Sequence, residues 1–303
     1  MARILITGAS GFLGWNLAAD LQPEHEVTAG YLRHRPEIGR AAAVELDVVD
    51  ARAVARVVDS AAPDLVIHSA ALSNPDDCER RPEAARAVNV EGTRHVAAAA
   101  RAAGARLVYL STDLVFDGSR GGYREEDPAA GRSVYARNKI EAEGLVAEAD
   151  PRAVVLRLAL LYGSGSPFYP GFLDTALTRW RAGEAMTFYV DQFRTPAPAS
   201  SVSEVIRRLL ARPEVRGLFH VGGADRISRH DFARLLADEV GADASLIRAG
   251  SMHDAGAVAP RGADCSLVSE RLGRVLGLAP VSCRAGLGAL AARGRLARIS
   301  GGA

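Results

Sequence analysis

A regular alternation of short apolar runs with helical patterns fills the first half of the 303-residue chain. The apolar runs predict buried β-strands, and the stretches between them have the spacing of helices. Strands that alternate with helices pair in parallel through right-handed crossovers. The sequence therefore predicts an α/β fold built on a Rossmann-type doubly wound parallel sheet. Strands are expected at residues 3–7, 26–29, 43–46, 65–68, 107–110 and 153–158, and helices at 11–21, 50–60, 82–103 and 134–148.

A glycine-rich turn, TGASGFLG (residues 7–14), joins the first strand to the first helix. Gly8 permits the tight turn, Gly11 removes a Cβ where backbone must approach a pyrophosphate, and Gly14 lets the helix lie close to the sheet. The spacing is GxxGxxG, so the prediction depends on the strand before it and the helix after it. The expected binding set at this helix start is Gly8, Ser10, Gly11, Phe12, Leu13 and Gly14.

The segment after the second strand, GYLRHRP (residues 30–36), indicates which dinucleotide binds. NAD sites usually place an acid about 20 residues after the glycine-rich turn, on the ribose 2′-hydroxyl. This segment has no acid, and Arg33 and Arg35 suit a 2′-phosphate. We therefore expect NADP, the alternative being a solvated basic loop. Asp47 is expected to accept a hydrogen bond from the adenine amino group, with Val48 beside it.

Tyr135 and Lys139 lie four residues apart on an expected helix, so their side chains share a face. A free phenol has a pKa near ~10, and a neighbouring ammonium lowers it. Lysine can also hydrogen-bond the cofactor ribose, and Thr112 offers a hydroxyl to a substrate carbonyl. Of 37 basic residues 36 are arginines, so the single lysine argues for a role that arginine cannot fill. The alternative is a surface cation beside a packing tyrosine.

Charge and composition exclude several function classes. The formal net charge of +1 favours neither nucleic acid nor an anionic membrane. The chain has no apolar run of about 18 residues and opens directly into a strand, which predicts a cytoplasmic protein. Its cysteines, Cys78, Cys265 and Cys283, are few, odd in number and far apart, so neither disulfides nor a zinc site is expected. The histidine spacing likewise predicts no metal. Asp113 and Asp117 are expected to cap and orient the loop that carries Thr112.

These motifs together resemble the extended short-chain dehydrogenase/reductases. They run in order through TGASGFLG (7–14), HSAA (68–71), NVEGT (89–93), LSTDLVFDG (110–118), YARNK (135–139) and RLALLYG (157–163). The resemblance implies Thr112, Tyr135 and Lys139 as the catalytic set. It also extends the cofactor site to Ala70, Ala71 and Asn89, with a structural water near Asn89.

The alternation stops after about residue 162, where glycine, proline and aromatic residues crowd 163–172. We expect an NADP-binding Rossmann domain over 1–165 and a smaller α/β substrate-binding region over 166–303, interleaved with the first around 195–215. Helices are expected at 173–182, 201–210 and 228–240, the last capped by Ser228, with a strand at 218–221. The tail at 285–303 is expected to fray.

A closer resemblance concerns the substrate. STDLVFDG (111–118), DQFRTP (191–196) and, more weakly, RGADCSL (261–267) look like dTDP-4-dehydrorhamnose reductases. This implies NADPH-dependent reduction of a nucleotide-linked 4-keto sugar or a related ketone. Two positions depart from that pattern: Leu160 and Leu161 stand where those reductases typically carry tryptophan, and Gly171 where they usually carry asparagine. We expect Leu160 to Phe172 to line the sugar pocket.

Two alternatives remain. GYLRHRP and RLALLYG look like the regulatory subunit of methionine adenosyltransferase, which keeps the reductase fold and binds NADP while serving a partner enzyme. A nucleotide-sugar epimerase or dehydratase is the other. Dehydratases usually add an acidic pair after the catalytic threonine, where this chain has only Asp113, and epimerases usually carry an acid after the second strand. The sequence leaves the oligomeric state open, a homodimer included.

Overall fold

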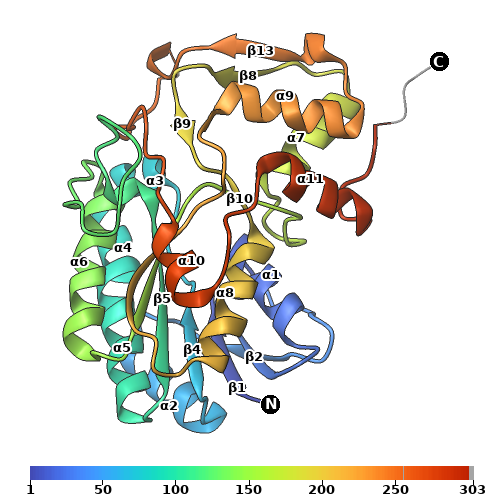
Figure 1. The fold of residues 1–303 in the computed structure, drawn as a ribbon. Coiled ribbons are helices and arrows are strands. Elements are labelled where there is room, and N and C mark those ends of the chain that lie inside the picture. The colour runs from blue at the N-terminus through green and yellow to red at the C-terminus, as the bar shows by residue number, and fades with distance from the viewer. Residues whose placement is uncertain (255, 300–303) are drawn as a thin grey trace.

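A seven-stranded parallel sheet forms the centre of the molecule (Figure 1). The computed structural model describes residues 1–254 and 256–299. The strand order is β11-β6-β5-β4-β1-β2-β3, so the direction of chain progression reverses between β1 and β4. This confirms the predicted doubly wound α/β fold. The strands are β1 (Arg3–Thr7), β2 (Glu26–Tyr31), β3 (Ala42–Glu45), β4 (Leu65–His68), β5 (Arg106–Thr112), β6 (Val154–Leu158) and β11 (Gly217–Val221).

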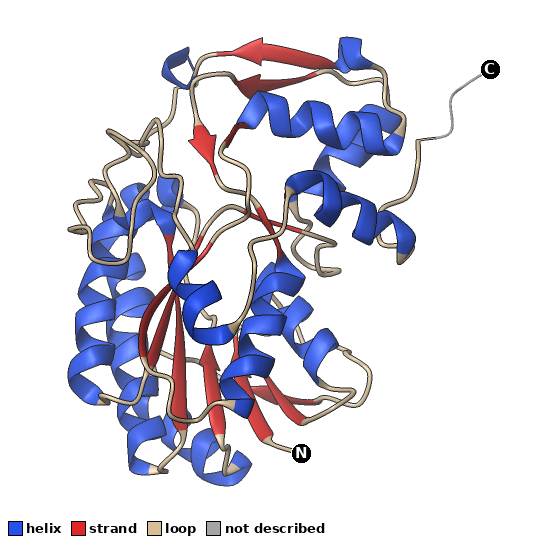
Figure 2. Cartoon of the chain, viewed as in Figure 1, coloured by secondary structure: helices blue, strands red, loops and turns tan. Residues whose placement is uncertain are grey.

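Helices cover both faces of this sheet, as Figure 2 shows. One face is covered by α1 (Phe12–Leu21), α8 (Ala199–Ala211) and α10 (Glu270–Leu276), and the other by α2 (Ala51–Ala61), α5 (Gly92–Ala102) and α6 (Val134–Ala149). Side chains of β1 alternate between the two faces of the sheet. Ile4 and Ile6 belong to the apolar cluster that contains residues of α1, α8 and α10, and Leu5 belongs to the cluster that contains residues of α2, α5 and α6. Burial on both faces explains why the strands are continuous apolar runs.

The expected helix over 82–103 is present as a continuous helical segment over residues 82–102, but it is not α-helical throughout. The chain instead forms α4 (Pro82–Arg86), a π-helical turn (Ala87–Glu91) and then α5. A further short helix, α3 (Pro75–Arg80), precedes them. Asn89 lies in the π turn, where its side chain bonds the backbone of Leu72, and Thr93 Oγ1 donates to the Asn89 carbonyl at 2.7 Å. Such turns insert an extra residue into a helix and are common at functional sites.

The smaller region packs its own core above the carboxyl ends of the strands (Figure 1). Trp180, Phe188 and Phe232 are central to this core. Ser228 caps α9 as predicted, its hydroxyl accepting a hydrogen bond from the Asp231 N–H. The elements of this region are β7 (Leu161–Tyr162), α7 (Phe172–Arg181), β8 (Met186–Tyr189), β9 (Phe193–Arg194), β10 (Ala197–Pro198), β12 (Ile227–Ser228), α9 (Arg229–Val240), β13 (Ile247–Gly250) and α11 (Cys283–Ala292), with 3₁₀ turns at Ala244–Leu246 and Met252–Asp254. A further 3₁₀ turn, Asp113–Val115, follows β5.

The chain passes between the two regions more than once. After β10 it returns to the sheet as α8, which packs on α1, and as β11, which pairs in parallel with β6. It returns again as α10 before ending in α11. The expectation that the tail frays is wrong for residues 285–299, because Leu287, Leu290 and Leu296 are buried and the Ile299 N–H donates to Val240 O at 2.7 Å. Residues 300–303 lie outside the described residues.

Three negative expectations can be compared with the structure. All three cysteines are buried and unpaired. In residues 1–254 and 256–299, no helix is long and apolar enough to cross a membrane. Over the same residues, no cluster of histidine, cysteine and acidic side chains is arranged to hold a metal ion.

Candidate active site

A cavity of about 620 Å³ lies between the carboxyl edge of the sheet and the smaller region. Ligands of open α/β sheets bind outside this edge, at the point where the strand order reverses. The cavity wall combines Phe12 from the glycine-rich turn, Thr112 from β5 and Tyr135 from α6. Leu160 and Leu161 complete the wall beside Tyr135, at the start of the segment expected to line a sugar pocket.

The glycine-rich turn has the geometry that its three glycines predict. Gly8 has a φ of +68°, and a Cβ there would lie 2.7 Å from the Cα of Ala70. A Cβ on Gly14 would lie 2.4 Å from Gly8 O, so glycine is needed for α1 to approach β1. Gly11 is the N-cap of α1, and no side chain caps the helix. The N–H groups of its first turn therefore point outward, where an anion can bind them.

The loop after β2 carries Arg33 and Arg35, both exposed. His34 between them stacks on Phe168 of the smaller region, with ring centroids 4.9 Å apart. Nearby, Ser166 Oγ donates to Ser10 O at 2.6 Å, so the 163–171 segment lies against the glycine-rich turn. The two arginines flank His34 in the sequence and do not line the cavity that contains Tyr135.

Of the other expected cofactor residues, Ala70 contacts the same turn. Ala70 lies against Gly8, directly after β4. Asn89 uses both its side-chain oxygen and its nitrogen on the backbone of Leu72, at 2.9 and 3.0 Å. Asp47 Oδ1 accepts from the Val49 N–H at 2.9 Å, and Val48 is buried against Gly92. Ala71 follows Ala70 in the same loop and is half-buried.

Thr112 and Tyr135 meet at the cavity, whereas Lys139 lies buried behind it. Lys139 Nζ donates to Leu110 O at 2.6 Å and sits 4.2 Å from the centre of the Tyr109 ring. Burial lowers the pKa of Lys139 to about 7, and the charge of Glu143 opposes that fall. The lysine is therefore held inside the protein, and it is not a surface cation.

The pKa of Tyr135 moves opposite to the sequence prediction. Burial raises it, as do the nearby Asp113 and Cys78, while the Thr112 hydroxyl opposes the rise. The expectation that Lys139 lowers this pKa is wrong for this arrangement, because its ammonium bonds a carbonyl of β5. Tyr135 is consequently protonated at neutral pH, which is the form that can donate a proton.

Three comparisons with known proteins bear on this site. The family described as RmlD substrate binding domain matches residues 2–295. The chain belongs to this family. It is 34% identical over 288 residues to the dTDP-4-dehydrorhamnose reductase of Mycobacterium tuberculosis, covering 92% of this chain and 88% of that one. It is 32% identical over 283 residues to methionine adenosyltransferase 2 subunit beta of Pongo abelii, covering 89% and 82%.

Solved structures agree with the RmlD fold. The dTDP-4-dehydrorhamnose reductase of Bacillus anthracis, in complex with NADP, superimposes with a TM-score of 0.84 at 28% identity, covering 96% of this chain and 99% of that one. MoeE5 in complex with UDP-glucuronic acid and NAD has a TM-score of 0.79 at 24% identity, which shows a shared fold only.

Sequence reasoning missed a group of cations in the cavity of this RmlD-family chain. Arg194 on β9 approaches Asp113, with Nε 3.4 Å from Oδ2, and both side chains are buried. Arg229, at the start of α9, lines the same cavity, and its burial, with the charge of Arg194, lowers its pKa to about 10. DQFRTP contains Arg194 and RGADCSL contains Arg261, which also lines the cavity, so those motifs held a signal. Arg229 stands in no motif.

Asp113 belongs to the cavity as well as to the loop it was expected to orient. Its Oδ1 accepts from Thr112 Oγ1 at 3.2 Å, and burial raises its pKa. Its Oδ2 has no hydrogen-bond partner among the described residues. Asp117, the other residue expected to orient that loop, accepts from Tyr123 Oη at 2.5 Å and from Ser119 Oγ at 3.0 Å.

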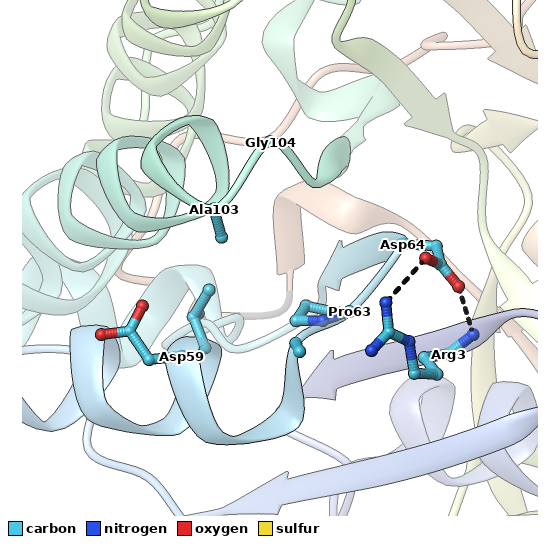
Figure 3. Close-up of a pocket in the computed structure, with 8 residues that line it drawn as sticks. Arg3, Asp59, Pro63, Asp64, Ala103 and Gly104 are labelled. Carbon is cyan, nitrogen blue, oxygen red and sulfur yellow. Dashed lines mark hydrogen bonds and ion pairs between the residues drawn. The ribbon is translucent and has the colours of Figure 1, made fainter.

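A second hollow of about 390 Å³ lies at the opposite, amino edge of the sheet (Figure 3). Its charged side chains include Arg3 and Asp64, which pair with each other at 3.2 Å. Because parallel α/β sheets carry their chemistry at the carboxyl edge, the cavity beside Tyr135 is the candidate active site.

Proposed function

We propose that this chain is an NADPH-dependent ketoreductase acting on a nucleotide-linked 4-keto sugar or a related ketone. The observation that carries the proposal is the meeting of Thr112 and Tyr135 in the wall of one cavity, with Lys139 buried on the same helix behind them. The cavity opens beside a phosphate-binding turn, so a bound dinucleotide and a ketone would lie together there.

The residues present fit NADP. The cradle at Gly8 and Gly14 is one that a Cβ would fill, and α1 begins without a side-chain cap. Arg33 and Arg35 are exposed on the loop that follows β2, and residues 30–36 include no acid that would favour a 2′-hydroxyl. Ser10, Phe12, Leu13, Asp47, Val48, Ala70, Ala71 and Asn89 complete the proposed cofactor site. When bound, NADPH supplies a hydride to the substrate carbonyl.

The chain's own residues would supply the remaining steps. Thr112 would hold the ketone oxygen through its hydroxyl, and Tyr135 would donate its phenolic proton to the same oxygen as negative charge develops there. The raised pKa of Tyr135 keeps the phenol protonated until that moment. Lys139, the single lysine, shares a helix face with Tyr135 and would contact the cofactor ribose.

The cavity cations support an anionic substrate. Arg194, Arg229 and Arg261 line it; Asp113 pairs with Arg194 and Asp76 with Arg261, whereas Arg229 has no ion-pair partner among the described residues. Guanidinium groups bind phosphate oxygens through paired hydrogen bonds, as a nucleotide diphosphate would require. Leu160 and Leu161 offer an apolar wall where the resembling reductases have an aromatic ring, which favours a more deoxygenated or branched ketone.

The test is the oxidation of NADPH, followed by absorbance, across a panel of nucleotide-linked 4-keto sugars. The Tyr135→Phe variant is the matched control, because it keeps the ring and removes the proton donor. Substrate-dependent oxidation by the wild-type chain and its loss in the control support the proposal. Equal rates in both proteins contradict the role given to Tyr135.

A regulatory NADP-binding subunit is the second candidate, favoured by the 32% identity to methionine adenosyltransferase 2 subunit beta. It differs from the first in one measurable respect. A regulatory subunit would bind NADPH with measurable affinity yet oxidise it with no ketone of the panel, and it would change the activity of an added methionine adenosyltransferase. The intact set of Thr112, Tyr135 and Lys139 favours the reductase.

A further inference from the structure

A buried ion pair lies directly behind Lys139. Glu143 on α6 and Arg157 on β6 are 8% and 6% exposed, and Arg157 Nη2 and Nε lie 2.7 and 3.0 Å from the two carboxylate oxygens. Ser111 Oγ adds a third hydrogen bond to the same carboxylate at 2.5 Å. A buried ion pair usually stabilises a fold no better than apolar residues of similar volume. Its presence beside the candidate active site therefore invites a functional explanation.

Consecutive residues of strand β5 form hydrogen bonds with side chains of helix α6 beside Lys139. On α6, Tyr135, Lys139 and Glu143 follow one another at intervals of four, so they share one face. Lys139 donates to the carbonyl of Leu110, and the next residue of β5, Ser111, donates to Glu143. The following residue, Thr112, lines the cavity together with Tyr135.

Arg157 secures this arrangement from the neighbouring strand. It lies opposite Ser111 in the register of β5 and β6, and its Nη1 has no hydrogen-bond partner among the described residues. Arg157 donates hydrogen bonds to the same Glu143 carboxylate that Ser111 binds. These bonds hold the carboxylate one helical turn beyond Lys139.

The other ionisable groups around Lys139 leave Glu143 as its source of negative charge. His68 on β4 is buried, and burial together with the charge of Lys139 lowers its pKa to about 3, so it is neutral. Burial raises the pKa of Tyr109 on β5 and of Tyr135 on α6, so both are neutral phenols. Arg157 on β6 is a cation.

We propose that Glu143 is a positioning residue that keeps Lys139 a charged ammonium directed at the carboxyl end of β5. Its own position is fixed by Arg157 and Ser111. The link to catalysis rests on the proposed function, in which Lys139 serves the reaction. The effect on the charge of Lys139 does not depend on that function.

The single lysine makes this effect directly measurable. Protein grown with [ε-¹³C]lysine has one labelled side chain, Lys139, whose carbon chemical shift reports ionisation as pH is varied. Removing a negative charge one helical turn away lowers the pKa of a buried lysine, so Glu143→Gln should move the titration midpoint of Lys139 down by about one pH unit or more. Glu141→Gln is the matched control on the same helix, because Glu141 is exposed and pairs with Arg86. Its midpoint should equal that of the wild type.

An unchanged midpoint in Glu143→Gln overturns the proposal. If this variant does not fold, because Arg157 is left as an uncompensated buried charge, Glu143→Gln combined with Arg157→Met removes both charges together. The double variant is compared with Arg157→Met, so that only the charge of Glu143 differs between the two proteins, and its midpoint should be the lower of the two. Equal midpoints in these two proteins are equally decisive against the proposal.

Turnover separates this proposal from the proposed function. If Lys139 must be charged, kcat falls as pH rises through its pKa, and Glu143→Gln should shift that alkaline limb to lower pH with KM little changed. A shifted lysine titration with an unshifted alkaline limb overturns the positioning role. A wild-type chain that reduces no ketone contradicts the proposed function, and the titration still decides whether Glu143 maintains the charge of Lys139.

Discussion

Two glycines of the phosphate-binding turn should respond to the same substitution in different ways. At Gly14, a Cβ would lie 2.4 Å from Gly8 O and 2.9 Å from Ala9 Cα. Both atoms belong to the backbone, so the clash can be relieved only by moving α1 away from β1. At Gly11, the atom nearest to an added Cβ would be Gly8 O at 3.3 Å, and the φ of −73° suits any residue.

Gly14→Ala should therefore destabilise the fold. Overpacking of this kind costs roughly 1–3 kcal/mol, and the better helix propensity of alanine offsets up to about 1 kcal/mol of it. A net loss of about 1–2 kcal/mol lowers the Tm by about 2–8 °C at the sensitivity expected for large domains. Thermal unfolding monitored by circular dichroism, without cofactor, measures the change.

Gly11→Ala should leave the Tm nearly unchanged and weaken NADPH binding. A methyl group where the pyrophosphate approaches would remove about one charged hydrogen bond, roughly 1.5–3 kcal/mol, which is a 10- to 100-fold rise in Kd. Fluorescence titration with NADPH measures it. The reasoning fails if Gly14→Ala melts with the wild type, or if Gly11→Ala binds NADPH with unaltered affinity.

Four further predictions concern the proposed chemistry. Tyr135→Phe should lower kcat by about 10²–10⁴-fold, the usual contribution of a positioned acid, with the Kd for NADPH little changed; wild-type turnover would remove Tyr135 from the mechanism. Lys139→Arg should abolish most activity despite keeping the charge, because the larger planar guanidinium does not fit the buried position that the ammonium occupies beside the Tyr109 ring and the Leu110 carbonyl; retained activity would make the single lysine a coincidence. Replacing Arg33 and Arg35 together by Ala should shift preference from NADPH toward NADH by about 10- to 100-fold, measured as the ratio of the two kcat/KM values, and an unshifted ratio counts against the 2′-phosphate role. With dTDP-4-dehydrorhamnose, kcat/KM should fall well below the diffusion-limited range, because Leu160 cannot stack on a sugar face as an indole can; a value near that range contradicts the substrate argument.

The cofactor half of the fold was predictable because its signals are local. Parallel strands buried on both faces produce continuous apolar runs, and the glycine-rich turn carries its own conformational requirement at Gly8. The π turn at Asn89 was not predictable, since it arises from hydrogen bonds with Leu72, which is distant in sequence. The helical spacing of the sequence runs through residues 87–91 without a break, so it gave no sign of the π turn.

The substrate half was harder to predict because its residues come together only through the tertiary fold. Arg194 and Arg229 lie on β9 and α9, and neither has a sequence spacing that relates it to Thr112. The pKa of Tyr135 depended on burial and on Asp113, which sequence spacing to Lys139 could not show. The tail looked unstructured from its composition, yet Leu287 and Leu290 pack against the smaller region's core.

The late arrival of β11 in the chain has a consequence for synthesis on the ribosome. Until residue 221 has emerged, the outer edge of β6 has no strand beside it, and until α8 has emerged, Leu17 and Leu21 of α1 lack part of their covering. The nucleotide-binding turn is made first, but the sheet that supports it is complete only after nearly three quarters of the polypeptide has been translated. A nascent chain paused before α8 would thus expose an unpaired strand edge and an apolar helix face, which are the surfaces that chaperones bind and that aggregation begins from.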